Sequence, residues 1–166
     1  MNTELAVRFG RKVRDLIADP IYKEIFPNTD LKPDSQAAGR WETSAGGEYF
    51  AAGVGAAMTG RGADLLIIDD PHSEQDALSS TAYDNAYEWY TSGPRQRLQP
   101  GGTIIIVQTR WSKKDITGRL LQAQQKDIMA DQWEVVEFPA IMPSGEPLWP
   151  EFWQKEELLK VKASLS

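Results

Sequence analysis

The sequence contains no cysteine, and His72 is the only histidine among its 166 residues. Disulfide bonds and thiolate metal sites are therefore excluded, and so is a metal site built from several histidines. No apolar run approaches the roughly 18 residues that a membrane-spanning helix needs. Residues 1–14 lack the pattern of a signal peptide. These absences predict a protein of the cytoplasm that has no membrane partner.

Basic residues are also missing from one long stretch, because residues 62–94 carry seven acidic side chains and no lysine or arginine. The next stretch, 94–126, carries one acidic side chain and seven basic ones, which are Arg95, Arg97, Arg110, Lys113, Lys114, Arg119 and Lys126. The formal net charge of −6 alone argues against a nucleic-acid binder. The uneven distribution instead predicts an acidic site beside a basic stripe that contacts DNA or another subunit. Ordinary patchiness of surface charge is an equal alternative.

The rest of the composition is that of an ordinary folded domain, since 41% of the residues are hydrophobic and 25% are charged. The length fits one domain with a sizeable core. Helical spacing and end signals predict helices at 3–18, 21–26, 76–90, 113–127 and 151–163. Alternation and apolar runs predict strands at 41–43, 49–52, 65–70, 103–109 and 133–138. Loops are expected at 31–38, 53–62 and 139–150.

Strands that alternate with helices are typical of an α/β fold with a mostly parallel sheet and helices on both faces. The continuous apolar run at 65–70 predicts a central strand, preceded by a β-hairpin. The single domain then has four parts, which are a helical start (1–30), the hairpin and central strand (39–70), a helix–strand–helix–strand part (76–138) and a loop with a final helix (139–166). Ligands of such sheets bind beyond the carboxyl ends of the strands.

Asp69 and Asp70 lie at such a strand end. A carboxylate there can hold Mg²⁺ beside a bound phosphate, usually through water. The next residue points to the opposite face, where it can polarise an attacking water. This is the logic of the Walker B strand of ATPases. The equal alternative is that Asp69, Asp70 and Pro71 form an ordinary turn after a strand.

Two further side chains fit a phosphate site. Thr109 ends the neighbouring strand, after Gln108 and before Arg110, and its hydroxyl can sense the γ-phosphate or the attacking water. A plain strand end is the favoured interpretation of Thr109 taken alone. Arg61 lies on a glycine loop just ahead of strand 65–70, where an arginine can present its donors to a phosphate as an arginine finger. A surface arginine is an equal alternative. His72 is interpreted as a packed or surface side chain.

The sequence has no G-x-x-x-x-G-K-[ST] motif. The nearest glycine cluster, at 53–62, contains no lysine. A standard phosphate cradle is therefore missing from these residues, so that Asp69 and Asp70 would form only half of a nucleotide site.

Several short motifs occur in one order along most of the chain, and they are FP at 26–27, WET at 41–43, GGEY at 46–49, GVG at 53–55, TGRGADLLIIDDP at 59–71, QTRW at 108–111, DITGR at 115–119 and FPA at 138–140. Together they resemble the large subunit of tailed-phage terminases, the ATPase that packages DNA into capsids. Each motif alone is weak, whereas TGRGADLLIIDDP followed by TRW and Asp-x-x-Gly-Arg is specific.

The resemblance implies a P-loop NTPase fold of the ASCE type and a motor that couples ATP hydrolysis to packaging of double-stranded DNA. It implies that Asp69 binds Mg²⁺. Asp70 would lie with Asp69 in the nucleotide site and would be the acid that orients the attacking water. Thr109 would couple hydrolysis to DNA movement, and Arg61 would act as an arginine finger on a neighbouring subunit. The implied cofactors are Mg²⁺ and ATP. The implied partners are double-stranded DNA, neighbouring large subunits, the small terminase subunit and the portal, in the host-cell cytoplasm.

The resemblance is incomplete in three respects. The family's Walker A loop lies upstream of the helix at 3–18 and its RNase H-like nuclease domain lies downstream of Ser166, and neither is found in this sequence. Asp70 stands where the catalytic acid is more often glutamate. We therefore expect an internal portion of the packaging ATPase that alone hydrolyses no ATP at a useful rate.

Three rival interpretations remain. Another P-loop motor, such as a helicase, shares the strand-end acids and Thr109 but does not predict the WET, GGEY and TRW motifs in this order. A two-metal nuclease needs additional acids, and Asp64 and Glu137 are poorly placed to supply them. A non-catalytic remnant that binds DNA or a packaging subunit through the basic stripe is the third alternative.

Overall fold

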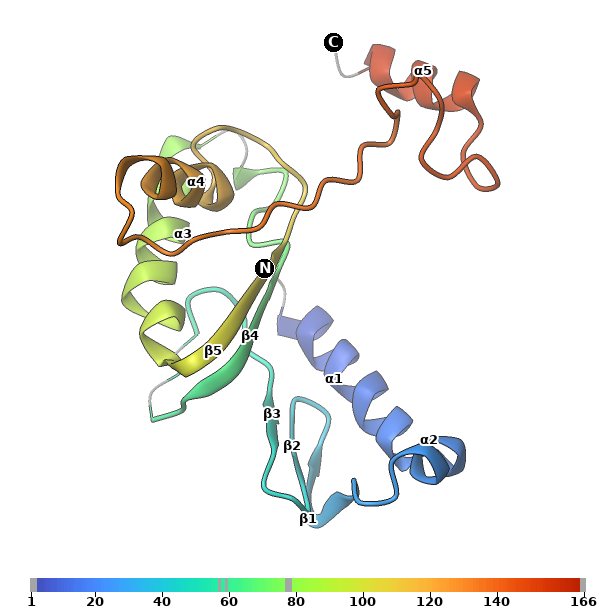
Figure 1. Cartoon of the computed structure of the whole chain (residues 1–166), viewed down its shortest axis with the longest axis vertical. Coiled ribbons are helices and arrows are strands. Elements are labelled where there is room, and N and C mark those ends of the chain that lie inside the picture. Colours follow the sequence, from blue (N-terminus) through green and yellow to red (C-terminus); the bar gives the residue numbers. More distant parts are fainter. Residues whose placement is uncertain (1–2, 57, 59, 77–78, 165–166) are drawn as a thin grey trace.

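The computed structural model describes residues 3–56, 58, 60–76 and 79–164, and Figure 1 shows its elements. The helices are α1 (Thr3–Ala18), α2 (Pro20–Ile25), α3 (Ser80–Ser92), the 3-10 helix η2 (Pro94–Arg97), α4 (Ile116–Lys126) and α5 (Lys155–Ser164). The strands are β1 (Leu31–Ala37), β2 (Arg40–Thr43), β3 (Glu48–Phe50), β4 (Ala63–Asp69) and β5 (Leu98–Val107). In the described ranges, β1, β2 and β3 form an antiparallel sheet, and β4 and β5 form a parallel pair. The fold is therefore mixed α/β.

Helix α1 packs on the antiparallel sheet through two aromatic residues. Trp41 Nε1 donates to the carbonyl of Gly10 at 3.0 Å, and Tyr49 OH donates to the carbonyl of Ala6 at 2.9 Å. Their rings stack with centroids 5.1 Å apart. A Cβ on Gly10 would lie 2.2 Å from a ring atom of Tyr49, so glycine permits this close approach. The predicted N-terminal helix has the bounds of α1, and β2 and β3 confirm the predicted hairpin.

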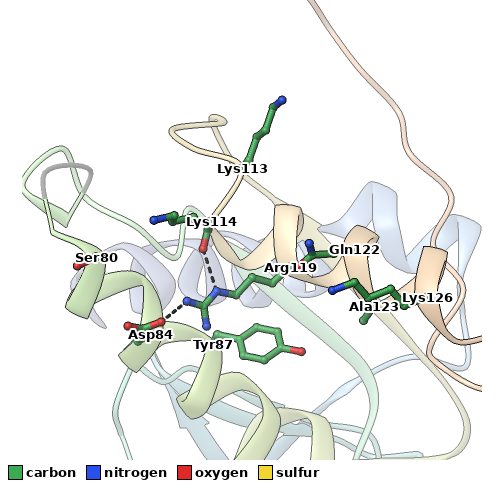
Figure 2. Close-up of a pocket in the computed structure, with 9 residues that line it drawn as sticks. All are labelled: Ser80, Asp84, Tyr87, Lys113, Lys114, Arg119, Gln122, Ala123 and Lys126. Atoms are coloured by element: carbon green, nitrogen blue, oxygen red, sulfur yellow. Dashed lines mark hydrogen bonds and ion pairs between the residues drawn. The ribbon is translucent and has the colours of Figure 1, made fainter.

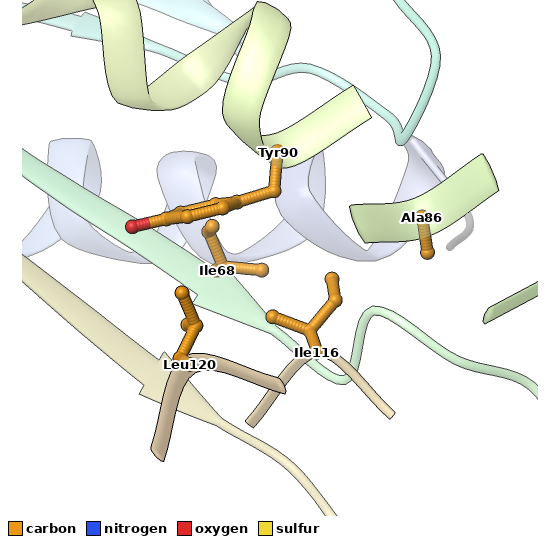
Figure 3. Packing of buried hydrophobic residues seen from close by; sticks show 5 residues of the cluster. All are labelled: Ile68, Ala86, Tyr90, Ile116 and Leu120. Carbon is orange, nitrogen blue, oxygen red and sulfur yellow. The ribbon is translucent and has the colours of Figure 1, made fainter. Parts of the chain in front are cut away.

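The parallel pair carries a hydrophobic core on one face. Ile68 of β4 packs there with Ala86 and Tyr90 of α3 and with Ile116 and Leu120 of α4, as Figure 3 shows. All five side chains are buried, and Leu66, Ile104 and Ile106 add partly buried surface. Burial of apolar surface at about 25 cal/mol per Å² is the main force that holds helices on a sheet face. This packing fixes α3 and α4 beside the strand ends that follow Ile68.

The other face of the parallel pair is open. Leu65, Ile67 and Val107 expose 54%, 59% and 54% of their surface, and Ile105 is exposed as well. The prediction of helices on both faces is therefore wrong for the described part of the chain, where α3 and α4 cover one face only. The apolar run at 65–68 that predicted burial on both sides is present, but only alternate residues are packed.

The third predicted strand, at 133–138, is not formed. The side-chain amide of Gln124 holds the start of this segment, because its oxygen accepts from the backbone N–H of Trp133 at 2.8 Å. From 134 to 140 the chain has no regular secondary structure and is exposed, with Val136 66% and Phe138 77% exposed. Figure 1 shows this segment leading away from the core to the part that carries α5. An apolar pattern favours a strand, but a strand also needs a neighbour to pair with.

Several element boundaries also differ from the predictions. Residues 31–37 form β1 instead of a loop, and β5 begins at Leu98 instead of 103. Ser73 and Asp76 form mutual hydrogen bonds, but α3 is capped by Ser79 and begins at Ser80 instead of 76. Helix α4 begins at Ile116, and α5 begins at Lys155. No helix in the ranges given above is long and apolar enough to cross a lipid bilayer.

Candidate functional site

Two strand ends meet at one edge of the parallel pair, as their sequence pattern predicts. Asp69 is in register with Val107, and the backbone N–H of Asp70 donates to the carbonyl of Val107 at 2.7 Å. Asp69 and Asp70, at the end of β4, therefore lie at the same edge of the sheet as Gln108 and Thr109, which follow β5. This is the edge at which parallel α/β sheets bind ligands.

The two acids differ in environment. Asp69 is half-buried and alternates with Ile68, so its side chain is on the open face, with Ile67 and Leu65. Asp70 is exposed and has φ +46°, a left-handed backbone conformation that turns the chain into the buried Pro71. Adjacent carboxylates on opposite sides of a strand end can serve two roles, one at a metal ion and one at a water.

The acids fit one kind of metal site and not another. Within the described residues, no group of three or more histidine, aspartate or glutamate side chains is arranged to hold a metal ion. A cage made entirely of protein ligands therefore has no candidate there. Mg²⁺ in nucleotide sites is instead held by one or two carboxylates together with waters and phosphate oxygens. Asp69 is suited to that arrangement, and the phosphates would need a cradle that this sequence lacks.

On the neighbouring strand, Thr109 is exposed and free to meet a ligand, as its predicted role requires. Gln108 was given no role from the sequence. Its amide nitrogen and oxygen are both buried and have no hydrogen-bond partner among the described protein atoms. A buried amide without hydrogen-bond partners costs free energy, so Gln108 is an unsatisfied polar group at this strand end.

His72 joins this strand end to helix α4. Its Nε2 accepts from the backbone N–H of Ile116 at 3.2 Å, and its ring lies edge-on to Tyr83 at 5.0 Å between centroids. Burial lowers the pKa of His72, although the carboxylates of Asp115, Asp76 and Asp70 act in the opposite direction. The imidazole is therefore neutral at neutral pH, with its proton on Nδ1. The interpretation of His72 as a packed side chain agrees with this burial.

Asp115 caps the helix that covers the core. Its Oδ1 accepts from the backbone N–H of Gly118 at 2.7 Å, and its Oδ2 accepts from Arg110 Nε at 2.9 Å and from the N–H of Ser112 at 3.3 Å. Burial alone would raise the pKa of Asp115, but these three donors outweigh it and hold the pKa below its usual value. Arg110, predicted to contact DNA, is therefore engaged within the protein. The sequence signal for this cap is an aspartate just before an apolar helix.

Arg61 lies far from the acids along the strand. It precedes β4, whereas Asp69 ends it, and a strand of this length spans about 20 Å. Its guanidinium forms an ion pair with Glu48 of β3 and lies 4.4 Å from the centre of the Phe50 ring. The structure thus does not bring Arg61 together with Asp70 and Thr109. Thr59, the first residue of the quoted motif around Arg61, lies outside the described residues.

Six of the seven residues of the basic stripe divide into two groups. Arg95 forms two hydrogen bonds with Asp131, at 2.6 and 2.7 Å, and Arg110 pairs with Asp115. Lys113, Lys114, Arg119 and Lys126 instead line a cavity of about 670 Å³ beside α3 and α4, shown in Figure 2. Arg97 is not among the residues that line it. Asp84, Tyr87 and Gln122 also line the cavity, and the sequence does not single them out because α3 and α4 meet only in the fold.

Comparison with known proteins adds no information about this site. No protein-family model, curated protein or solved structure matches the chain. The functional assignment consequently depends on the motifs of the sequence and on the geometry described above.

Proposed function

We propose that this chain is part of the ATPase motor of a terminase large subunit, which couples ATP hydrolysis to packaging of double-stranded DNA. The observation that carries the proposal is the adjacency of two strand ends, because Asp69 is in register with Val107 and Asp70 donates to the carbonyl of Val107, two residues before Thr109. That edge is where parallel sheets bind nucleotides. The order of the WET, GGEY, TGRG and TRW motifs favours this motor over a helicase.

Each residue then has a separate task. Asp69, half-buried at the strand end, would hold Mg²⁺, which neutralises charge on the phosphates when nucleotide is bound. Asp70 is exposed to solvent and would accept a hydrogen bond from the attacking water and orient it. The hydroxyl of Thr109, one strand away, would report the state of the phosphate to the segment that leads into α4. That segment ends at the Asp115 cap, so a shift at Thr109 would reach α4 directly.

The site would be completed by groups from outside these 166 residues. The β and γ phosphates need backbone N–H groups and a lysine that neutralise and position them. The sequence contains no motif that supplies them. The open face of β4 and β5, on which Asp69 lies, leaves room for such a segment.

Arg61 is proposed to act on a neighbouring subunit. The length of β4 separates it from Asp69 by about 20 Å, which is too far for contact with the same γ-phosphate. Its pairing with Glu48 holds the guanidinium at the surface of the antiparallel sheet. An arginine presented in this way can serve a nucleotide that is bound to another copy.

The first test is steady-state ATP hydrolysis by the purified chain with Mg²⁺. We expect no turnover above that of buffer, for the unmodified chain and for Asp69→Asn alike, because the phosphates have no cradle. Clear activity that Asp69→Asn abolishes would show that the chain holds a complete site.

The second test measures metal binding at the strand end. Mn²⁺ replaces Mg²⁺ in such sites and broadens the NMR signals of nearby amides. With ATP present, we expect broadening centred on residues 69, 70 and 109, and we expect Asp69→Asn to remove it. Asp64→Asn makes the same charge change at the other end of β4 and should leave it unchanged. Broadening that is centred elsewhere, or that survives Asp69→Asn, would contradict the proposed site.

A further inference from the structure

The cavity beside α3 and α4 gathers positive charge. Lys113 and Lys114 come from the loop before α4, Arg119 from its first turns and Lys126 from its end. Among the described residues that line it, Asp84 of α3 is the only acidic side chain, so four cations face one carboxylate. This concentration contrasts with the formal net charge of −6 for the whole chain. A local field of this kind attracts anions whatever the sign of the total charge.

Three of the four cations are not engaged within the described part of the protein. Lys113, Lys114 and Lys126 form none of the ion pairs found there. Their ammonium groups are strongly hydrated, and each has three donors to offer. The other arginines of the basic stripe with known contacts, Arg95 and Arg110, are already neutralised by aspartates.

Arg119 is held in place at the cavity wall. It forms an ion pair with Asp84, its Nε donates to the carbonyl of Lys114 at 3.1 Å, and its guanidinium lies 5.2 Å from the centre of the Tyr87 ring. The guanidinium therefore loses little conformational entropy when an anion binds to its remaining donors. Asp84 competes with any such anion, because its carboxylate already accepts from the Arg119 guanidinium.

The arrangement suits a chain of phosphates better than one small anion. In Figure 2 the cationic groups spread along the cavity and do not converge on one point. Arg119 and Lys126 are seven residues apart on α4, which corresponds to two turns and a rise of about 10 Å. Groups spaced in this way along one helix face meet successive phosphates of a polymer.

We propose that this cavity binds the phosphodiester backbone of double-stranded DNA. Lys113, Lys114 and Lys126 each neutralise a phosphate, and Arg119 provides an oriented donor between them. Contacts to phosphates carry no sequence information, so binding through these cations is independent of base sequence. The choice of DNA over another polyanion rests on the proposed function. The binding itself rests only on the cavity.

The experiment is fluorescence anisotropy with a labelled duplex of about 20 base pairs, titrated at several salt concentrations without nucleotide or divalent metal. The test variant replaces Lys113, Lys114 and Lys126 by glutamine. We expect it to bind at least about tenfold more weakly at low salt, with a slope of log affinity against log salt that is shallower by about 2.7. A matched variant with Lys12, Lys23 and Lys160 changed to glutamine carries the same net charge and should keep the affinity and slope of the unmodified chain.

A single substitution tests the opposite direction. Asp84→Asn removes the competing carboxylate. We expect it to tighten binding about two- to threefold while the protein stays folded. Circular dichroism of each variant confirms that it is folded.

Three outcomes overturn the proposal. They are equal affinity of the unmodified chain and the test variant, an equal loss in the matched variant, and lysine-dependent binding of tripolyphosphate without binding of the duplex. The last outcome identifies a small polyphosphate as the ligand. The DNA-binding experiment contains no nucleotide or metal ion. A negative result in it therefore does not bear on Mn²⁺ binding at Asp69, and a negative Mn²⁺ result does not bear on DNA binding by the cavity.

Discussion

The two faces of the β4–β5 sheet have the same kind of side chain and different surroundings. Leu66, Ile68, Ile104 and Ile106 face α3 and α4, whereas Leu65, Ile67, Ile105 and Val107 face outwards. Both sets are leucine, isoleucine or valine, as in parallel strands buried on both sides. The comparison teaches that the apolar character of a strand residue does not determine its contribution to stability. That contribution depends on what covers the residue.

The largest expected effect is on the covered face. Ile68 is 2% exposed and touches both covering helices. We expect Ile68→Ala to lower the free energy of unfolding by about 3 kcal/mol, because it removes buried methyl groups and leaves a cavity. Urea denaturation followed by circular dichroism measures this change. A loss below about 1 kcal/mol would mean that this face is less well packed than the contacts indicate.

The next effect concerns the helix that forms the cover. Asp115→Asn keeps the size of the α4 cap but removes its charge, and we expect a loss of about 1–2 kcal/mol at pH 7. Because the pKa of Asp115 is lower in the folded protein than in the unfolded chain, the carboxylate stabilises the fold above about pH 4. That contribution is lost as the pH falls through the folded-state pKa. The difference between the two proteins should therefore shrink in acid.

The control for this prediction lies at the other end of the same helix. Asp127→Asn makes the same charge change at an exposed position. We expect it to cost less than Asp115→Asn at pH 7. Equal costs would remove the buried cap as the cause.

The smallest effect is expected on the open face. Ile67 neighbours Ile68 but is 59% exposed, so Ile67→Ala should lower the free energy of unfolding by less than about 1 kcal/mol. The same denaturation experiment gives the value. A loss as large as that of Ile68→Ala, and one that grows with protein concentration, would show that the open face is covered in solution.

Local patterns predicted those elements whose partners lie nearby in the chain. The apolar residues of α1 recur at helical spacing, and Gly46 and Gly47 provide the turn between β2 and β3, so both features followed from sequence. Strand β1 was missed because Lys32, Pro33 and Asp34 read as a loop, although the backbone pairs with β2. The segment at 133–138 has a strand's composition but finds no neighbour. Such pairing depends on residues far apart and cannot be derived from composition.

The candidate site likewise has features that follow from local sequence and features that depend on contacts between distant elements. The placement of Asp69, Asp70 and Thr109 at one edge of the sheet follows from the rule that parallel strands end at one edge. The ion pair between Arg61 and Glu48, and the cavity that adds Asp84 and Tyr87 to the lysines, depend on how separate elements meet. The burial of Asp115 likewise depends on the packing of α4. No spacing in the sequence specifies these contacts.

The left-handed backbone at Asp70 limits which residues this position can accept during evolution. Aspartate, asparagine and glycine adopt such a conformation readily, whereas longer side chains do so at a cost of roughly 1 kcal/mol or more. Replacement by glutamate is thus a change of backbone energy as well as of side-chain length.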